Sequence, residues 1–211
     1  MEGPHQGQPV VQEGEPLETA RAAMILAHGR GASALDIMTI AAEVMFPGVA
    51  YLAPQAAGSV WYPNPFTAPF EANEPYLSSA LEVLSTLLSR VRSTIPTERI
   101  VLLGFSQGGC LTLEFATRNA QRYGGVIGLS AGLIGPDNIL RDYPGDFQRT
   151  PVFLGCSDVD PYIRKERVSM SAEIFQNMGA DVTARLYPGM GHTVNADEIE
   201  MVRSIVKAVA A

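Results

Sequence analysis

A serine, a histidine and two aspartates in this chain have the types and the order that acyl transfer needs. Ser106 lies in Gly104-Phe105-Ser106-Gln107-Gly108, which fits the pattern G-x-S-x-G. In that pattern a buried strand turns sharply into a helix, and the two glycines remove Cβ atoms that would clash in the turn. The serine then projects from the carboxyl edge of a sheet, where the N–H groups of the helix favour a developing oxyanion.

The five-residue pattern alone occurs by chance, so its context carries the prediction. An apolar run over residues 100–103 precedes Ser106 and predicts a buried strand, and residues 107–118 have the composition of a helix. The alternative is an ordinary strand-to-helix turn that contains a serine. The context favours a nucleophile elbow, because this motif requires a strand before the serine and a helix after it.

A serine nucleophile needs a base, and only one histidine follows Ser106 in the chain. His192 lies between the last predicted strand and the last predicted helix, in a glycine-flanked loop, and is the candidate base. His28 precedes the nucleophile, and we expect it to shape the loop after the first core strand. His5 falls within residues 1–8, which we expect to form a mobile tail.

Two aspartates follow the strand predicted over residues 152–154. Asp158 and Asp160 lie in the run Gly-Cys-Ser-Asp-Val-Asp-Pro, from which either carboxylate can reach an imidazole. We expect the aspartate that does not contact the histidine to pin the turn through backbone amides. The chemistry of the two residues does not choose between them.

The elements that must position these residues alternate along the chain. Short apolar runs predict strands and amphipathic stretches predict helices, a pattern typical of βαβ units and a mostly parallel sheet. The predicted strands cover residues 23–27, 49–52, 100–103, 126–129, 152–154 and 182–186, with an edge strand at residues 10–11. The predicted helices cover residues 33–45, 73–91, 107–118, 165–178 and 195–209. We therefore predict one α/β domain over residues 1–211, with helices on both faces of the sheet and no separate cap domain.

Residues 53–70 interrupt this alternation, since they are rich in proline and aromatic residues and predict a long irregular loop. Loops of this length inside a compact domain are often functional. We expect Trp61, Tyr62 and Phe66 to border a substrate pocket. The alternative is that the loop only packs onto the core.

The composition of the 211-residue chain narrows the class of protein. It is 46% hydrophobic and 18% charged, as in ordinary globular proteins, and its net charge of −7 argues against a nucleic-acid partner. No apolar run approaches the ~20 residues of a membrane span, and we expect no stable membrane association. The N-terminal residues lack the features of a signal peptide, so we expect a cytoplasmic protein.

The cysteine and histidine content bears on redox state and cofactors. The chain has two cysteines, Cys110 and Cys156, which we expect to be free thiols in a reducing compartment. The spacing of histidines and cysteines offers no metal cluster, and the expected chemistry needs no metal and no organic cofactor. A monomer and a small homo-oligomer are equally permitted.

Four runs, HGRG, GFSQGG, SDVDPYI and YPGMGH, resemble in sequence and order those of the phospholipase/carboxylesterase family of α/β-hydrolases. That family includes bacterial carboxylesterases and acyl-protein thioesterases. The resemblance extends from about residue 22 to the C-terminus. It implies the α/β-hydrolase fold and hydrolysis of carboxylic esters by a Ser-His-Asp triad.

The resemblance also bears on the remaining site residues. An Asp-Pro run carries the family's triad acid, and Asp160-Pro161 matches it, whereas the spacing from Gly155 points to Asp158; the match favours Asp160. The family's HGxG loop implies that the backbone N–H groups of Arg30 and Gln107 form an oxyanion hole. Relatives often carry leucine in place of Arg30, and we expect its side chain either to contact a substrate carboxylate or to pair with a nearby acid.

The resulting hypothesis is a serine hydrolase that prefers small-molecule esters with short acyl chains and works through an acyl-enzyme. Thioester or lysophospholipid hydrolysis is the alternative within the family. A lactone hydrolase similar to dienelactone hydrolase is less favoured, because those enzymes use a cysteine nucleophile. A non-catalytic binding module of this fold would be expected to have lost a member of the triad, and all three members are available here.

Overall fold

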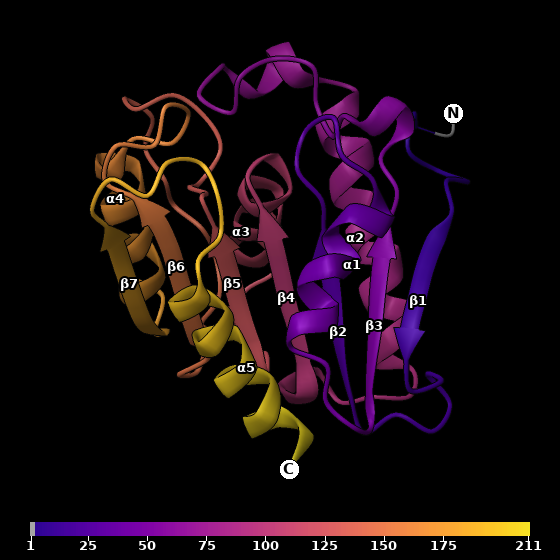
Figure 1. Ribbon diagram of the computed structural model, residues 1–211. Helices are drawn as coiled ribbons and strands as arrows, with labels where there is room; N and C mark the ends of the chain where they lie inside the picture. Colours follow the sequence, from indigo (N-terminus) through magenta and orange to yellow (C-terminus); the bar gives the residue numbers. More distant parts are fainter. Residues whose placement is uncertain (1–2) are drawn as a thin grey trace.

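The computed structural model describes residues 3–211 and contains a seven-stranded sheet. The strands lie side by side in the order β1-β3-β2-β4-β5-β6-β7, and only the β1–β3 pair is antiparallel (Figure 1). The strands are β1 (Val10–Gly14), β2 (Ala22–Ala27), β3 (Val49–Pro54), β4 (Ile100–Phe105), β5 (Gly125–Leu129), β6 (Pro151–Ser157) and β7 (Asp181–Tyr187). All the predicted strands are confirmed, and the one predicted at residues 10–11 is the antiparallel edge strand β1.

Five α-helices cover the two faces of the sheet. Helices α1 (Ala34–Glu43) and α5 (Ala196–Ala210) pack on one face, where they share an apolar cluster with the strands (Figure 1). Helices α2 (Tyr76–Arg92), α3 (Gln107–Arg118) and α4 (Lys165–Asn177) pack on the other face around a second cluster. The predicted fold class, a mostly parallel sheet between two layers of helices, is confirmed.

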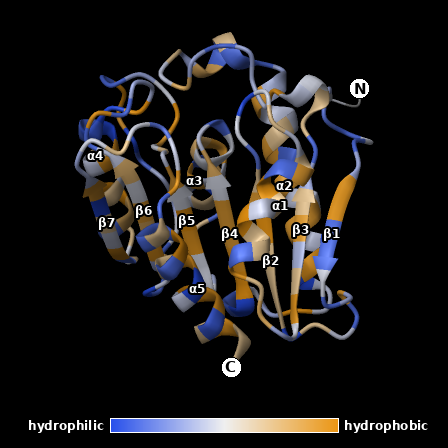
Figure 2. Cartoon of the chain, viewed as in Figure 1, coloured by the Kyte–Doolittle hydropathy of each residue, from blue (hydrophilic) through white to orange (hydrophobic). Residues whose placement is uncertain are grey.

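Burial explains the composition of the strands. Every residue of β2 and β3 is buried, as expected for strands covered on both faces, and Figure 2 shows apolar residues along the central strands. Strand β7 lies at the edge of the sheet, and its residues are exposed or only partly buried. The nucleophile therefore follows a strand that is covered on both faces, whereas the loop of His192 follows the edge strand.

Local sequence fixes where two of the helices begin. The Ser33 side chain accepts a hydrogen bond from the Asp36 N–H, and the Asp36 carboxylate accepts one from the Ser33 N–H, which forms a capping box at the start of α1. Helix α2 begins at Tyr76, later than predicted, because Pro75 disfavours helical backbone at the residue before it. Residues 70–73 form a separate 3₁₀ turn instead.

The parallel strands bring the site loops to one edge of the sheet. The carboxyl ends of β2 to β7 all point in the same direction, toward the top in Figure 1. The loops after β2, β3, β4, β6 and β7 therefore meet at this edge, although they are far apart in the sequence. These loops carry the candidate site residues.

Candidate active site

Ser106 occupies a strained turn between β4 and α3. Its φ of 54° and ψ of −119° lie outside the regions that non-glycine residues ordinarily adopt, and such a conformation costs on the order of 1–3 kcal/mol. A Cβ on Gly104 would lie 2.3 Å from the carbonyl oxygen of Gly108, and one on Gly108 would lie 2.2 Å from that of Ala27. The turn can form only with glycine at both positions, so the predicted elbow geometry is confirmed.

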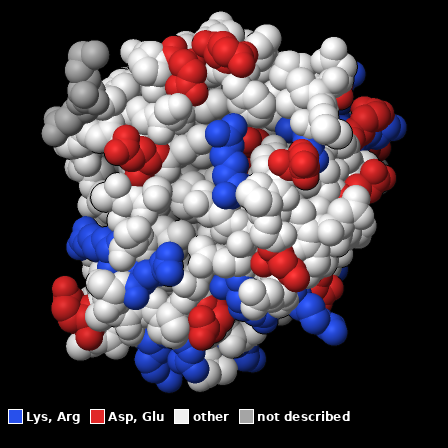
Figure 3. Space-filling model, turned by 180° about the vertical axis from the view of Figure 1, so that it is seen from behind, with Lys and Arg blue, Asp and Glu red and all other residues white. Residues whose placement is uncertain are grey.

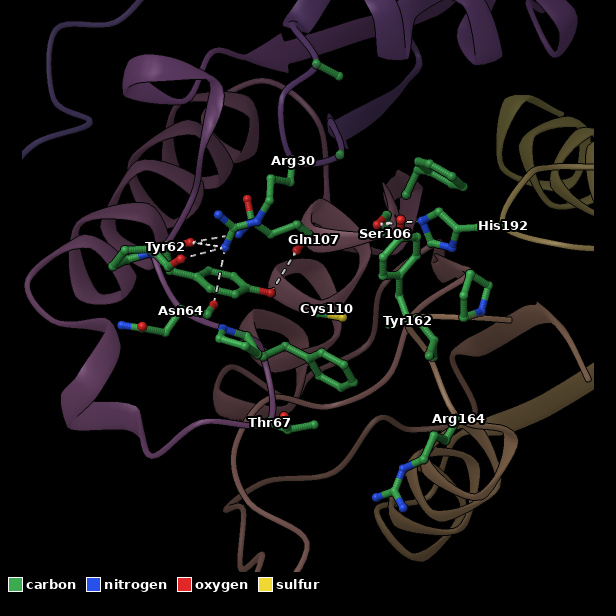
Figure 4. Close-up of a pocket in the computed structure, with 18 of the residues that line it drawn as sticks. Arg30, Tyr62, Asn64, Thr67, Ser106, Gln107, Cys110, Tyr162, Arg164 and His192 are labelled. Atoms are coloured by element: carbon green, nitrogen blue, oxygen red, sulfur yellow. Dashed lines mark hydrogen bonds between the residues drawn. The ribbon is translucent and has the colours of Figure 1, made fainter. Parts of the chain in front are cut away.

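The structure brings Ser106, His192 and Asp160 together in hydrogen-bonding order, and Figure 4 shows the contact between Ser106 and His192. The Nε2 atom of His192 lies 2.9 Å from Ser106 Oγ, and its Nδ1 atom lies 2.7 Å from Asp160 Oδ2. With Nδ1–H donating to the carboxylate, Nε2 keeps a lone pair that can accept the serine proton. The side chain of His192 is 18% exposed, and that of Asp160 is fully buried.

Hydrogen bonds keep Asp160 ionised in its buried position. Its Oδ1 atom accepts the backbone N–H groups of Tyr162 at 2.8 Å and Ile163 at 3.0 Å, and the Cys156 thiol donates to Oδ2 at 3.7 Å. Burial raises the pKa of Asp160, but the hydrogen bonds from His192 and the two backbone amides outweigh it, so the pKa lies below its usual value. The carboxylate of Asp160 is therefore charged near neutral pH.

Asp158 has a different contact. Its Oδ1 atom accepts the backbone N–H of Gly189 at 2.8 Å, and its own N–H donates to the carbonyl of Tyr187 at 3.1 Å. These bonds tie the turn after β6 to the loop that carries His192. Of the two aspartates that the sequence left open, Asp160 therefore contacts the imidazole and Asp158 pins the neighbouring backbone.

Two aromatic rings pack against the imidazole of His192. The ring centroid of Phe105 lies 5.1 Å from that of His192, and the ring of Tyr162 meets it edge-on at 4.9 Å. The phenylalanine comes from the end of β4 and the tyrosine from the turn after Asp160. Neither ring is among the predicted site residues, and the only local signal for Phe105 is its position directly before the nucleophile.

The two residues predicted to donate to the oxyanion, Arg30 and Gln107, line the same cavity as Ser106. Gln107 is the first residue of α3, so its N–H has no partner within the helix. Within residues 3–211, the N–H of Arg30 also has no protein acceptor. A Cβ on Gly29 would lie 3.6 Å from the Cβ of Ser106, which shows how closely the loop after β2 approaches the nucleophile.

The side chain of His28 links the loop after β2 to the loop after β3. Its Nδ1–H donates to the carbonyl of Gly29 at 2.8 Å, and its Nε2 accepts the N–H of Ala56 at 3.1 Å. The ring is fully buried, and this burial lowers the pKa of His28. A neutral imidazole can make both bonds at once, so the expected structural role agrees with the contacts.

The expectation of a mobile tail over residues 1–8 is wrong for His5; residues 1–2 lie outside the described residues. His5 is 1% exposed, its Nδ1 accepts the N–H of Ala57 at 3.0 Å, and its Nε2 lies 2.9 Å from the carbonyl of Trp61. The backbone N–H of His5 donates to Ser79 Oγ at 2.9 Å. The polar sequence around His5 concealed these contacts, because their partners lie 52–74 positions away.

A cavity of about 1190 Å³ opens beside Ser106 and His192. Tyr62 and Phe66 line it, as predicted, but Trp61 does not. The Trp61 side chain is fully buried, its ring packs 5.0 Å from that of His28, and its indole N–H donates to the His28 carbonyl at 2.8 Å. For Trp61 the alternative, packing of the loop onto the core, is therefore correct.

The cavity also has walls that the sequence did not predict. Cys110, one helical turn after Ser106, belongs to the buried apolar core and also lines the cavity. Further lining residues outside the predicted set come from the loops after β5 and β6 and include Pro136, Asp137, Pro161, Tyr162, Ile163 and Arg164. Pro161, Tyr162 and Ile163 belong to the run SDVDPYI, but their place in the cavity wall, like that of Pro136 and Asp137, depends on the strand order.

The side chain of Arg30 contacts backbone rather than an acid. One terminal nitrogen, Nη2, donates to the carbonyls of Tyr62 at 2.7 Å, Pro63 at 3.0 Å and Asn64 at 3.3 Å (Figure 4). The guanidinium forms no ion pair with any acid in the described part of the chain. The expected pairing of Arg30 with a nearby acid is therefore wrong.

Three further observations concern metals, thiols and membranes. Across residues 3–211, no group of three or more His, Cys, Asp or Glu side chains is placed to hold a metal ion. Cys110 and Cys156 are both free and buried, which confirms the expected thiols. Every helix in this part of the chain is too short or too polar to span a bilayer.

A strand-to-helix elbow after β4 in a mostly parallel sheet places the chain among the α/β-hydrolases. A phospholipase/carboxylesterase family profile matches residues 6–210. The chain belongs to this family of serine hydrolases, and the resemblance inferred from the four sequence runs is confirmed. A phospholipase/carboxylesterase of known structure from Dyadobacter fermentans DSM 18053 is similar, with 40% identity, a TM-score of 0.91 and coverage of 95% of this chain and 97% of that one.

The relatives found by sequence comparison include proteins named acyl-protein thioesterase 1. Acyl-protein thioesterase 1 of Gibberella zeae is 38% identical over 120 residues, which make up 56% of this chain and 51% of the relative. Acyl-protein thioesterase 1 of Candida albicans is 26% identical over 215 residues, which cover 90% of this chain and 93% of the relative. The chain spans about half the length of the fungal relatives that it matches above 30% identity.

Proposed function

We propose that this protein is a carboxylesterase in which Ser106 is the nucleophile, His192 the general base and Asp160 the triad acid. The observation that carries the proposal is the position of His192, whose Nε2 lies 2.9 Å from Ser106 Oγ while its Nδ1 lies 2.7 Å from Asp160 Oδ2. A hydroxyl, an imidazole and a carboxylate linked in this order form an acyl-transfer triad.

The proposed cycle transfers the acyl group first to the serine and then to water. His192 takes the Ser106 proton as Oγ attacks the ester carbonyl, and the backbone N–H groups of Arg30 and Gln107 bind the resulting oxyanion. The tetrahedral intermediate collapses to the acyl-enzyme, and His192 returns its proton to the departing alcohol. Water then attacks the acyl-enzyme with His192 again as base, which releases the acid and restores Ser106.

We propose a preferred class of substrate and a second candidate. We propose esters with short acyl chains, dissolved in water, as the preferred substrates, because the cavity opens directly beside Ser106 and its wall includes Tyr62 and Phe66. Thioester hydrolysis is the second candidate. It is favoured by the names of the fungal relatives and by the volume of about 1190 Å³, which exceeds what a short acyl group fills.

We further propose a cytoplasmic enzyme that acts without nucleic acid or membrane as partner and without a cofactor, as a monomer or small homo-oligomer. Two free buried thiols support a reducing compartment. The face seen in Figure 3 carries acidic and basic side chains interspersed rather than one basic patch. Light scattering after size-exclusion chromatography would give the oligomeric state.

The test compares wild-type protein with Ser106→Ala on nitrophenyl esters from acetate to long acyl chains, and on an acyl thioester. Wild type is expected to hydrolyse the esters with a maximum at short chains, and the variant to lose activity by about 10⁴-fold or more. A maximum with long chains or the thioester would favour the second candidate. Turnover that survives in folded Ser106→Ala would contradict the mechanism.

A further inference from the structure

The side chains of both proposed oxyanion residues bind the same short segment of the loop after β3. Arg30 donates through Nη2 to the carbonyls of Tyr62, Pro63 and Asn64, at 2.7, 3.0 and 3.3 Å. These bonds come from a cation, which makes them stronger than bonds between neutral groups. Figure 4 shows the guanidinium turned toward this segment, which we call the 61–64 bridge.

The side chain of Gln107 also contacts the 61–64 bridge. Its Oε1 atom accepts the N–H of Trp61 at 2.9 Å, and its Nε2 atom donates to the carbonyl of Tyr62 at 2.8 Å. The Tyr62 hydroxyl returns a bond to the carbonyl of Gln107 at 3.3 Å. Because Gln107 is only 6% exposed, these bonds are shielded from competing water.

The carbonyl of Tyr62 therefore joins the two residues, since it accepts from Arg30 Nη2 and from Gln107 Nε2. The two residues differ in how firmly the rest of the fold holds them. Gln107 lies at the start of a buried helix, whereas Arg30 is exposed in a loop between Gly29 and Gly31, and Gly31 has a φ of +77°. Hydrogen bonds hold the backbone on either side of Arg30, at the Gly29 carbonyl and the Gly31 N–H, and the Arg30 side chain adds the contact with the 61–64 bridge.

We propose that the 61–64 bridge sets the spacing between the two oxyanion donors, and that the Arg30 side chain is a positioning residue for catalysis. The inference rests on the proposed function, in which the backbone N–H groups of Arg30 and Gln107 bind the oxyanion. An oxyanion hole works only when its donors are preorganised at about 2.7–3.1 Å from the developing charge. The guanidinium acts on that charge through the backbone that it fixes.

The test replaces Arg30 by methionine, which keeps an unbranched chain and removes every donor. Arg203→Met is the matched control, because its Nη2 also donates to a backbone carbonyl, that of Glu43 at 2.7 Å, but Arg203 does not line the cavity or touch the bridge. For each protein, kcat and KM are measured with nitrophenyl acetate, together with the inhibition constant of phenylboronic acid. The boronate forms a tetrahedral adduct with a serine hydroxyl and so reports on the oxyanion hole.

For Arg30→Met, kcat is expected to fall about tenfold, less than the ~10²–10³ lost when a donor is removed outright, because the N–H remains but is misplaced. The inhibition constant of the boronate rises by a similar factor, and KM stays within about twofold. The control changes none of the three by more than about twofold. Unchanged kcat and boronate affinity in Arg30→Met would overturn the proposal, and so would a change confined to KM, which would assign Arg30 to substrate binding.

Arg30→Lys is the second variant and decides the matter if Arg30→Met does not fold. Lysine keeps the positive charge, but its ammonium reaches less far and lacks the planar fork. Its kcat is expected to lie between those of wild type and Arg30→Met, and full retention of kcat would overturn the proposal by showing that charge alone suffices.

The two proposals fail in distinguishable ways. If wild type hydrolyses the ester, Ser106→Ala does not, and Arg30→Met matches wild type, the proposed function stands and the bridge is overturned. If wild type hydrolyses no ester or thioester and a fluorophosphonate does not label Ser106, both are overturned.

Discussion

Each of the two sides of the site contains a histidine, but the two imidazoles bond different kinds of partner. On the acid–base side, formed by the loops after β6 and β7, both ring nitrogens of His192 bond side chains, Ser106 Oγ and Asp160 Oδ2. On the oxyanion side, formed by the loops after β2 and β3, His28 is fully buried and both ring nitrogens bond backbone groups.

This contrast shows what separates a catalytic histidine from a structural one. His192 keeps 18% of its side chain exposed, so its proton can pass to a substrate. The donor and the acceptor of the His28 ring both bond backbone groups. The proposed chemistry on that side therefore comes from backbone N–H groups. The partners of the imidazole, rather than its proximity to the serine, identify its role.

The largest expected effect is loss of the base on the acid–base side. His192→Ala should lower kcat by about 10⁴–10⁶-fold, because Ser106 then has no proton acceptor. Its melting temperature should stay within a few degrees of wild type, since the ring is partly exposed. Steady-state kinetics and thermal unfolding check both statements, and a variant that loses stability but retains turnover would reverse the roles assigned to the two sides.

The two aspartates should differ next most. Asp160→Asn is expected to lose about 10⁴-fold in kcat, because an amide cannot hold the required imidazole tautomer or stabilise its cation. Asp158→Asn is its matched control: it keeps an oxygen that can accept the Gly189 N–H, and should lose less than about tenfold. Equal losses in the two variants would show that the turn after β6, rather than one carboxylate, supports His192.

On the oxyanion side, His28→Ala should act on stability. Loss of two buried hydrogen bonds and of packing against Trp61 is expected to lower the free energy of unfolding by about 2–4 kcal/mol. Trp61 is the only tryptophan in the chain, so its fluorescence follows unfolding in urea. A change below about 0.5 kcal/mol would show that the loop does not depend on the imidazole.

The contribution of the oxyanion side to the free energy of unfolding depends on pH in a defined direction. Burial lowers the pKa of both His5 and His28 from about 6.5, so the unfolded chain binds protons that the folded chain excludes. The stability that these residues contribute is complete above pH 6.5 and is lost as pH falls below it. His28→Ala should therefore show a shallower loss of stability than wild type between pH 7 and pH 5.

The smallest effect belongs to Glu198, which lies in the first turn of α5, the helix that follows the loop of His192. Burial raises the pKa of this fully buried carboxyl from 4.5 to about 7, and its Oε1 atom has no hydrogen-bond partner among the described residues. Its stabilising contribution is complete below pH 4.5 and is lost as pH rises toward 7, the opposite sign to the histidines.

Glu198→Gln should remove that loss, because glutamine stays neutral and can still accept the Asn195 N–H of the capping box. Relative to wild type, the variant should gain about 1–2 kcal/mol in the free energy of unfolding between pH 5 and pH 7. Urea unfolding at the two pH values measures the gain. An equal difference at both values would show that Glu198 ionises normally in the folded protein.

The sequence by itself determined the features that depend on neighbours along the chain. The elbow at Ser106 follows from glycines two positions to either side, and the strands and helices follow from the spacing of apolar residues within each element. His192 was identified because only one histidine follows the nucleophile. Each of these inferences uses local geometry or chain order, and both are fully present in the sequence.

Only the tertiary structure decided which groups touch. Asp160 rather than Asp158 meets His192, Trp61 turns into the core while Tyr62 and Phe66 face the cavity, and His5 is buried. These contacts join loops from different strands, across 32 to 86 positions for the residues bonded to His192. A shift of one or two residues in a turn redirects a side chain without changing the local pattern, and the packing of the other loops fixes that choice.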